Sequence, residues 1–135
     1  MTIQNSVVAR NARLDAFETA VGTSAILKIR TGAQPASCAN TDSGTVLATL
    51  NLPSDWLDAA SGGVKSKSGT WEDLTADAAG TAGHYRIYAS DGTTCHEQGT
   101  VTAAGGGGDM TLDNTNIAVN QQVTVTGYTR TAGNA

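Results

Sequence analysis

The chain has 135 residues and a formal net charge of −4, with 4% aromatic and 15% charged side chains. This length fits one domain with a single core. The acidic balance disfavours nucleic acid and acidic membrane surfaces as partners, and no apolar run is long enough to span a bilayer. The first five residues lack the basic and apolar stretches of a secretory signal, so we expect a soluble protein made in the cytoplasm.

Residues 6–21 are predicted to form a helix. Ser6 is suited to cap its first turn, and Gly22 stands where helices commonly end. Apolar side chains recur at helical spacing along one side, at Val7, Leu14, Phe17 and Val21. This stripe either packs on the chain's own domain or docks on another subunit, and we take these four residues as the candidate interface.

After Gly22 the apolar period changes from that of a helix to the alternation of strands. Strands are expected at residues 25–30, 45–52, 64–72, 84–90, 93–101 and 121–130, with a short helical turn at 54–60. We count about seven or eight short strands separated by turns. The predicted fold is mainly β, an antiparallel, jelly-roll-like β-sandwich over residues 24–135, preceded by a helical segment at 1–23 within one domain.

The strongest hairpin signal is the Asp-Gly pair at residues 91–92, which favours a two-residue type I′ turn. In that register Tyr88 faces Cys95. Arg86 then faces Glu97, which gives an opposite-charge pair across the strands. Four consecutive glycines at 105–108 predict either a flexible connector or a place where another backbone approaches closely.

Few side chains are suited to catalysis. The two histidines, His84 and His96, stand in no recognisable motif, and Cys95 and His96 are neighbours that point to opposite faces of a strand. Together with Cys38 they show no metal-ligand spacing, and the glycine run lacks the ending of a phosphate loop. We therefore expect no enzyme, no cofactor and no metal site.

The two cysteines allow two interpretations. Cys38 and Cys95 are either two buried thiols in a reducing compartment or one disulfide formed after the protein leaves the cell. Closing such a loop is worth about 4 kcal/mol in the chain-entropy model.

The larger aromatic side chains also allow two interpretations. They form either a platform for sugar rings or part of the core, and burial is favoured for the two tryptophans. These residues are Trp56, Trp71, Tyr85, Tyr88 and Tyr128.

A resemblance to a known family rests on five stretches, residues 22–35, 44–50, 52–56, 80–88 and 92–96. They are similar to a family of small proteins encoded by tailed bacteriophages and prophages, and the resemblance covers nearly the whole chain. It implies a virion structural protein, in particular a capsid decoration or cement protein, and it supplies no catalytic residues.

The resemblance thus implies synthesis in the host cytoplasm and a final location on the capsid exterior. The expected partners are the major capsid protein or other virion subunits and further copies of the chain, since a homo-oligomer suits a symmetric shell. Two alternatives remain open. One is a tail, head-fibre or connector component, and the other is a carbohydrate-binding module that attaches the particle to its host.

Overall fold

The computed structural model describes residues 3–133, which contain one helix and nine strands. The helix is α1 (Val7–Val21). The longer strands are β1 (Ile26–Thr31), β2 (Val46–Asn51), β5 (Gly80–Tyr88), β6 (Cys95–Ala103) and β9 (Val123–Thr131). The shorter ones are β3 (Val64–Ser66), β4 (Glu72–Asp73), β7 (Met110–Leu112) and β8 (Asn116–Ile117).

The helix begins and ends where its capping residues predict. The Ser6 side chain accepts a hydrogen bond from the backbone N–H of Ala9 at 3.1 Å. At the other end Gly22 has a φ of 91°, and its N–H donates to the carbonyl of Glu18. The predicted N-terminal helix is therefore confirmed.

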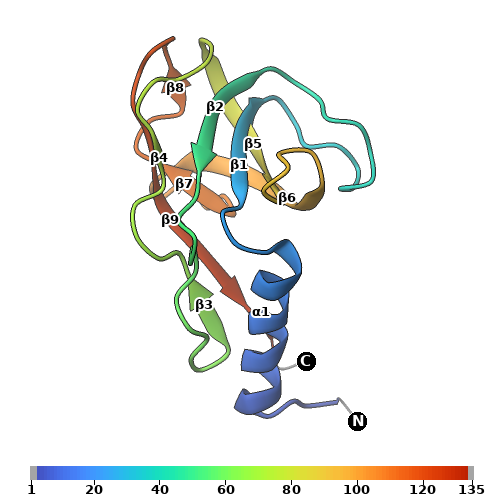
Figure 1. Cartoon of the computed structure of the whole chain (residues 1–135). Coiled ribbons are helices and arrows are strands. Elements are labelled where there is room, and N and C mark those ends of the chain that lie inside the picture. Colours follow the sequence, from blue (N-terminus) through green and yellow to red (C-terminus); the bar gives the residue numbers. More distant parts are fainter. Residues whose placement is uncertain (1–2, 134–135) are drawn as a thin grey trace.

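The strands form one curled, mixed sheet in the order β2-β1-β5-β6-β7-β9-β3, with β4 paired to β9 and β8 paired to β5. The mainly-β fold with one N-terminal helix is confirmed. The finer prediction of an antiparallel, jelly-roll-like sandwich is not, because the hydrogen-bonded path is continuous and β6 pairs with β7 in parallel. Figure 1 shows α1 at one end of the molecule and β8 at the opposite end.

The parallel pair explains the four-glycine run. Parallel neighbours ordinarily need a crossover of a dozen or more residues, yet Val101 in β6 pairs with Met110 in β7. Gly105 and Gly107 have φ values of 84° and 82°, which other residues rarely adopt. A Cβ on Gly108 would lie 2.9 Å from the backbone nitrogen of Thr102. The run is thus the close backbone approach that the sequence allowed for.

The core runs along the inner face of the sheet and is crossed by a row of aromatic rings. Phe17 of α1 contacts Trp56, with ring centroids 6.1 Å apart, and Trp56 contacts Trp71 at 5.8 Å. Tyr128 continues the row against Trp71 at 5.2 Å and meets Tyr85 at 6.2 Å. Both tryptophans are fully buried, which confirms their predicted place in the core.

The β5–β6 hairpin differs from its predicted register by a bulge. Tyr88 pairs with Cys95 as expected, but the register shifts before it, so that Arg86 pairs with Gln98 and not with Glu97. The turn is not type I′, because in the Asp-Gly pair at residues 91–92 only the glycine has a positive φ. The extra residue of the bulge moves each cross-strand pair from Ile87 back to His84 by one position.

Three other local predictions were wrong. Residues 54–60 form no helical turn, and Leu57 there makes an isolated bridge to Lys67. The strand expected at 64–72 is divided into β3 and β4, and β5 begins at Gly80, four residues before the strand expected at 84–90. Each correction concerns a segment of mixed polarity whose conformation depends on a distant partner strand.

Candidate functional site

Three residues of the predicted helix stripe attach α1 to its own domain. Leu14 and Val21 are each 4% exposed. Phe17 is half-buried against the core, and the guanidinium carbon of Arg130 lies 3.5 Å from the centre of its ring. Of the four candidate interface residues only Val7 is exposed, so in this conformation the stripe is used within the chain.

Polar contacts strengthen this attachment. The side chain of Lys65 in β3 is 3% exposed, and its Nζ lies 2.7 Å from Asp15 and 2.9 Å from Glu18 of the helix. Burial by itself would lower the pKa of Lys65, but hydrogen bonds to these two carboxylates raise it. The backbone N–H of Gly63 also donates to Asn11 Oδ1 at 2.8 Å. The helix is therefore fixed on the sheet by both apolar and charged contacts.

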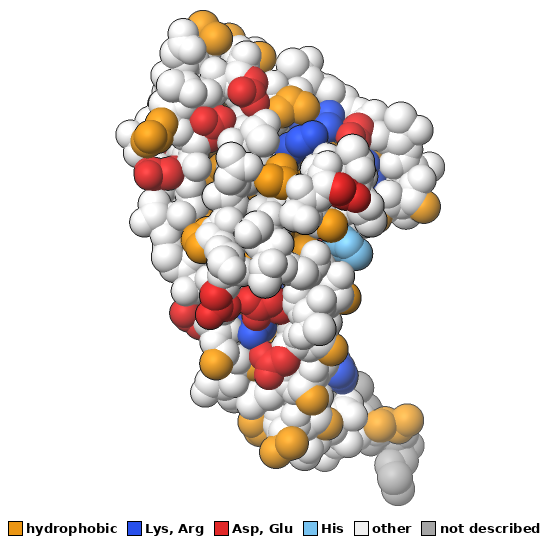
Figure 2. Space-filling model, in the orientation of Figure 1, with side chains coloured by type: hydrophobic (Ala, Val, Ile, Leu, Met, Phe, Trp, Pro, Cys, Tyr) orange, Lys and Arg blue, Asp and Glu red, His pale blue; other side chains and the backbone are white. Residues whose placement is uncertain are grey.

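Four apolar side chains near the start of α1 and at the start of β3 are exposed to solvent. Ile3 and Val8 are each 79% exposed, Val7 is 46% exposed, and Val64 at the start of β3 is 37% exposed. Figure 2 shows hydrophobic side chains gathered at this end of the molecule, below the acidic side chains of its middle. We call these four residues the exposed apolar end. Exposed apolar groups that lie together mark surfaces used for contact with other molecules.

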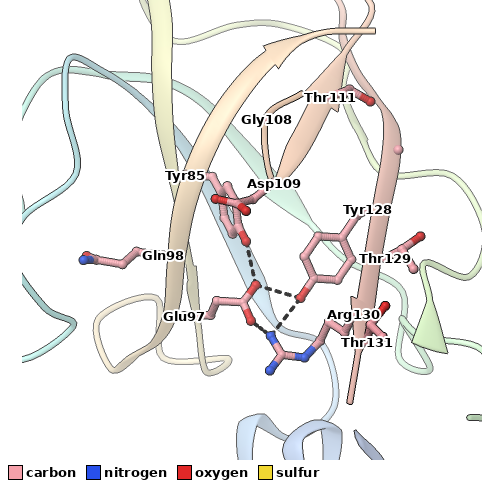
Figure 3. Close-up of a pocket in the computed structure, with 11 residues that line it drawn as sticks. Tyr85, Glu97, Gln98, Gly108, Asp109, Thr111, Tyr128, Thr129, Arg130 and Thr131 are labelled. Atoms are coloured by element: carbon pink, nitrogen blue, oxygen red, sulfur yellow. Dashed lines mark hydrogen bonds and ion pairs between the residues drawn. The ribbon is translucent and has the colours of Figure 1, made fainter. Parts of the chain in front are cut away.

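A second feature is a groove of about 620 Å³ between β6, β7 and β9, which we call the polar pocket. Figure 3 shows the Glu97 carboxylate between the hydroxyls of Tyr85 and Tyr128 and the guanidinium group of Arg130. The hydroxyls of Tyr85 and Tyr128 donate to its Oε1 at 2.6 and 2.7 Å, and Arg130 forms an ion pair with its Oε2. Glu97 thus has a partner on both oxygens.

The chemistry of the polar pocket favours binding over proton transfer. Burial raises the pKa of both Tyr85 and Tyr128, so their hydroxyls stay protonated and act as donors at neutral pH. Asp109 accepts from the backbone and the side chain of Thr100, each at 2.9 Å. Further hydroxyl groups line the walls, from Thr111 and Thr129, whereas the Gln98 amide points away from the pocket and donates to Pro35 (Figure 3). Such a mixture of fixed donors and acceptors suits a hydroxylated ligand.

Sequence reasoning missed the network around Glu97, because it paired this residue with Arg86. The actual partners of Glu97 come from β5 and β9. Tyr128 lies more than thirty positions after Glu97 in the chain. Tyr128 and Arg130 stand two residues apart on β9 and therefore share a face. That spacing was the available signal, but the pairing of β9 with β7 was needed to show what the face meets.

A charged cluster lies on the other side of β5. Asp42, in the loop between β1 and β2, pairs with Arg30 at 2.9 Å and also forms an ion pair with Arg86. Both guanidinium groups are buried, and the Tyr88 hydroxyl also donates to Asp42. Burial alone would raise the pKa of Asp42, but the hydrogen bonds from Tyr88 and Arg86 lower it. Asp42 is thus the counter-charge that these two arginines need.

The two cysteines lie beside each other in the fold, whereas one histidine is buried and the other is exposed. Cys38 and Cys95 meet, with their Sγ atoms 2.7 Å apart. His84 is fully buried with its Nδ1 2.9 Å from the carbonyl of Gly32, whereas His96 is exposed. Between residues 3 and 133 no three or more histidine, cysteine or acidic side chains gather as metal ligands would.

The comparisons with known proteins identify no family. No family model, no curated protein and no solved structure matches the chain. Within the described part of the chain, α1 is too short and too polar to cross a membrane. The function is therefore argued from the residues and their geometry.

Proposed function

We propose that this chain is a non-enzymatic structural protein of a tailed-bacteriophage virion, a decoration protein that binds the outside of the head and bridges neighbouring capsid subunits. The resemblance of the sequence to small phage and prophage proteins supports this function. The observation that carries it is the exposed apolar end, which is separate from the chain's own core. Its proposed occupant is the apolar outer surface of the assembled capsid subunits.

The exposed apolar end is suited to weak contacts that are repeated many times. Fully burying a valine or isoleucine side chain contributes about 1.5 to 3 kcal/mol, so a few such residues give modest affinity for each copy. A shell presents the same surface many times, and copies that also touch one another raise the effective concentration. Stable coverage of the head therefore needs neither a large interface nor a catalytic group.

The rigid attachment of the helix supports the same function. Because Arg10 donates to the carbonyl of Ala132 at 2.7 Å and Asn11 accepts from the backbone N–H of Gly63, the start of α1 is held against β3 and the end of β9. A preformed surface loses little conformational entropy on binding. Ile3, Val7 and Val8 lie at or just before the first turn of α1 and are presented by it.

A matched pair of substitutions tests this function. Val8 and Val119 are both exposed, but Val119 follows β8, at the end of the molecule opposite α1 (Figure 1). We expect Val8→Asp to lower the number of copies bound per particle by about tenfold or more, because it would bury a charge at the interface. Val119→Asp should bind as the unchanged chain does. Quantitative mass spectrometry of purified particles measures both.

The number of copies per particle distinguishes a head decoration protein from a tail component. A decoration protein should be present in hundreds of copies, and particles lacking it should tolerate heat or osmotic shock less well. Tens of copies or fewer would favour the alternative, a tail, head-fibre or connector component. Equal binding of the Val8→Asp and Val119→Asp variants would contradict docking through the exposed apolar end.

The polar pocket favours a second candidate function, the binding of a host-surface glycan. Asp109 and the threonines of its walls offer the donors and acceptors that sugar hydroxyls require. Calorimetric titration with neutral and acidic oligosaccharides tests this, with Asp109→Asn as the variant that should lose binding. Absence of heat across such a panel would remove this candidate and leave the docking proposal unaffected.

A further inference from the structure

Two cysteines that are distant in the chain meet at one side of the sheet. Cys38 lies in the long loop between β1 and β2, residues 32–45, which we call the β1–β2 loop. Cys95 is the first residue of β6, and the two Sγ atoms are 2.7 Å apart. Figure 1 shows this loop extending along the side of the molecule where β5 turns into β6. Both cysteine side chains are partly exposed, so a small oxidant can reach them.

The β1–β2 loop is held in place by hydrogen bonds that do not involve sulfur. Gln98 of β6 donates its Nε2 to the carbonyl of Pro35 at 2.6 Å. Arg86 of β5 donates its Nη2 to the carbonyls of Ser37 and Asn40 at 3.1 and 3.2 Å. These bonds stand on both sides of the loop cysteine. The two thiols are therefore brought together by the fold before any bond forms between them.

A further anchor lies a few residues along the loop. The Asp42 carboxylate pairs with the buried guanidinium groups of Arg30 and Arg86 and accepts a hydrogen bond from Tyr88 at 2.7 Å. Tyr88 also pairs with Cys95 across the hairpin. The charged cluster and the cysteine pair thus join the same two segments at neighbouring points.

We infer that Cys38 and Cys95 form an intramolecular disulfide once the protein leaves a reducing compartment, and that this bond locks the β1–β2 loop onto the β5–β6 hairpin. The inference stands on the geometry of the loop and does not depend on the docking function proposed above. In the reducing cytoplasm the pair remains as two thiols, and the loop is held by the charged cluster and by the hydrogen bonds from Gln98 and Arg86.

The oxidant is a small disulfide such as glutathione disulfide. Burial raises the pKa of Cys95, so this thiol loses its proton only as it attacks, in the second step. The Cys38 thiolate attacks one glutathione sulfur and releases the first glutathione thiolate. The Cys95 thiolate then attacks the Cys38 sulfur of the mixed disulfide and releases the second. The two cysteines lose two electrons in total, and the two glutathione molecules gain those electrons and the two thiol protons.

The bond should stabilise the fold and protect the loop. Closing a chain segment of this length reduces the entropy of the unfolded state, and we expect the melting temperature of the oxidised protein to lie about 10 °C above that of the reduced protein. The β1–β2 loop should also resist a non-specific protease when oxidised. Trypsin cannot report on this, because residues 31–64 contain no lysine or arginine.

The experiment treats the purified chain with glutathione disulfide or with a reducing agent. Thiol titration under denaturing conditions should find no free thiol after oxidation and two after reduction. Tryptic digestion without reduction should join the peptides of residues 31–65 and 87–130. The double variant Cys38→Ser with Cys95→Ser should melt at the temperature of the reduced protein under both conditions, and its loop should be cleaved equally by proteinase K in both.

Three results would overturn the inference. Two titratable thiols after oxidation would show that the pair does not react. Bridges between two chains, seen as a dimer on a non-reducing gel, would show that the cysteines find other partners. A bridge that forms within the chain but changes neither the melting temperature nor loop cleavage would show that it does not lock the loop. None of these results bears on the number of copies bound to a particle.

Discussion

The hydroxyl of Tyr88 donates a hydrogen bond of 2.7 Å to Asp42, a residue 46 positions earlier in the chain. Tyr88 is in β5, between β1 and β6 in the sheet order, whereas Asp42 lies in a loop with no regular structure. Through Asp42 this loop also neutralises Arg30 and Arg86, which are buried. An irregular surface loop thus supplies the charge on which two buried arginines depend.

Stability should therefore depend on the ionisation of Asp42. Its pKa in the folded state is lowered from 3.8, so its contribution to the free energy of unfolding is complete above that value and is lost as the pH falls through the lowered pKa. We expect Asp42→Asn to destabilise the protein at neutral pH by about 3 kcal/mol, because the two arginines lose their counter-charge. The difference from the unchanged protein should narrow as the pH falls below 3.8.

Denaturant unfolding at several pH values measures this difference. Asp58→Asn is the matched control, since Asp58 is exposed and no side chain or backbone group of residues 3–133 forms a hydrogen bond or ion pair with its carboxylate. It should change the free energy of unfolding by less than about 0.5 kcal/mol at every pH. If the difference between Asp42→Asn and the unchanged protein did not depend on pH, the charge of Asp42 would not be the stabilising feature.

Glu97→Gln should destabilise the fold. The substitution removes the negative charge that faces Arg130 and places an amide, part donor and part acceptor, opposite two tyrosine hydroxyls that both donate. We expect a loss of about 2 kcal/mol in the free energy of unfolding, together with a change in the near-ultraviolet circular dichroism of the tyrosines. Glu72→Gln is the control, because Glu72 makes a single exposed hydrogen bond to Gln122. Equal stability of the two variants would contradict a supporting role for Glu97.

Leu14→Asp tests whether the apolar stripe of α1 packs on the chain's own domain or is free to bind a partner. Because Leu14 is buried against the domain, a carboxylate there should destabilise the fold by about 3 kcal/mol or more. Val8→Asp, on the exposed side of the same helix, should leave the free energy of unfolding within about 0.5 kcal/mol of the unchanged protein. Thermal and denaturant unfolding compare the two. A folded Leu14→Asp variant of unchanged stability would show that the stripe is free for a partner.

Local chemistry was sufficient to predict the helix and most strands. Ser6 and Gly22 each act through atoms within four residues of themselves, so the ends of α1 can be read without knowing the fold. The alternation of apolar residues likewise identified β1 and β2, because their buried and exposed faces follow from the pleat. The core positions of Trp56 and Trp71 followed from their size and apolar character.

Predictions that needed a distant partner were less successful. The bulge in the β5–β6 hairpin moved Arg86 away from Glu97, and no residue pattern in the hairpin predicted this bulge. The parallel pairing of β6 with β7 depends on the four-glycine turn. The sequence allowed two interpretations of that turn, a flexible connector or a close backbone approach. The exposed apolar end was missed because Val64 joins the helix residues only through the packing of β3 on α1.

The amino-acid sequence alone determined the mainly-β class, the single helix with its ends, and the scarcity of catalytic side chains, since each depends on residue type and short-range spacing. Only the tertiary structure decided which face of the helix is free, which residues surround Glu97 and that Cys38 lies beside Cys95. These relationships join positions far apart in the chain. They exist only because the curled sheet brings β5, β6, β9 and the β1–β2 loop together, and no local spacing encodes that approach.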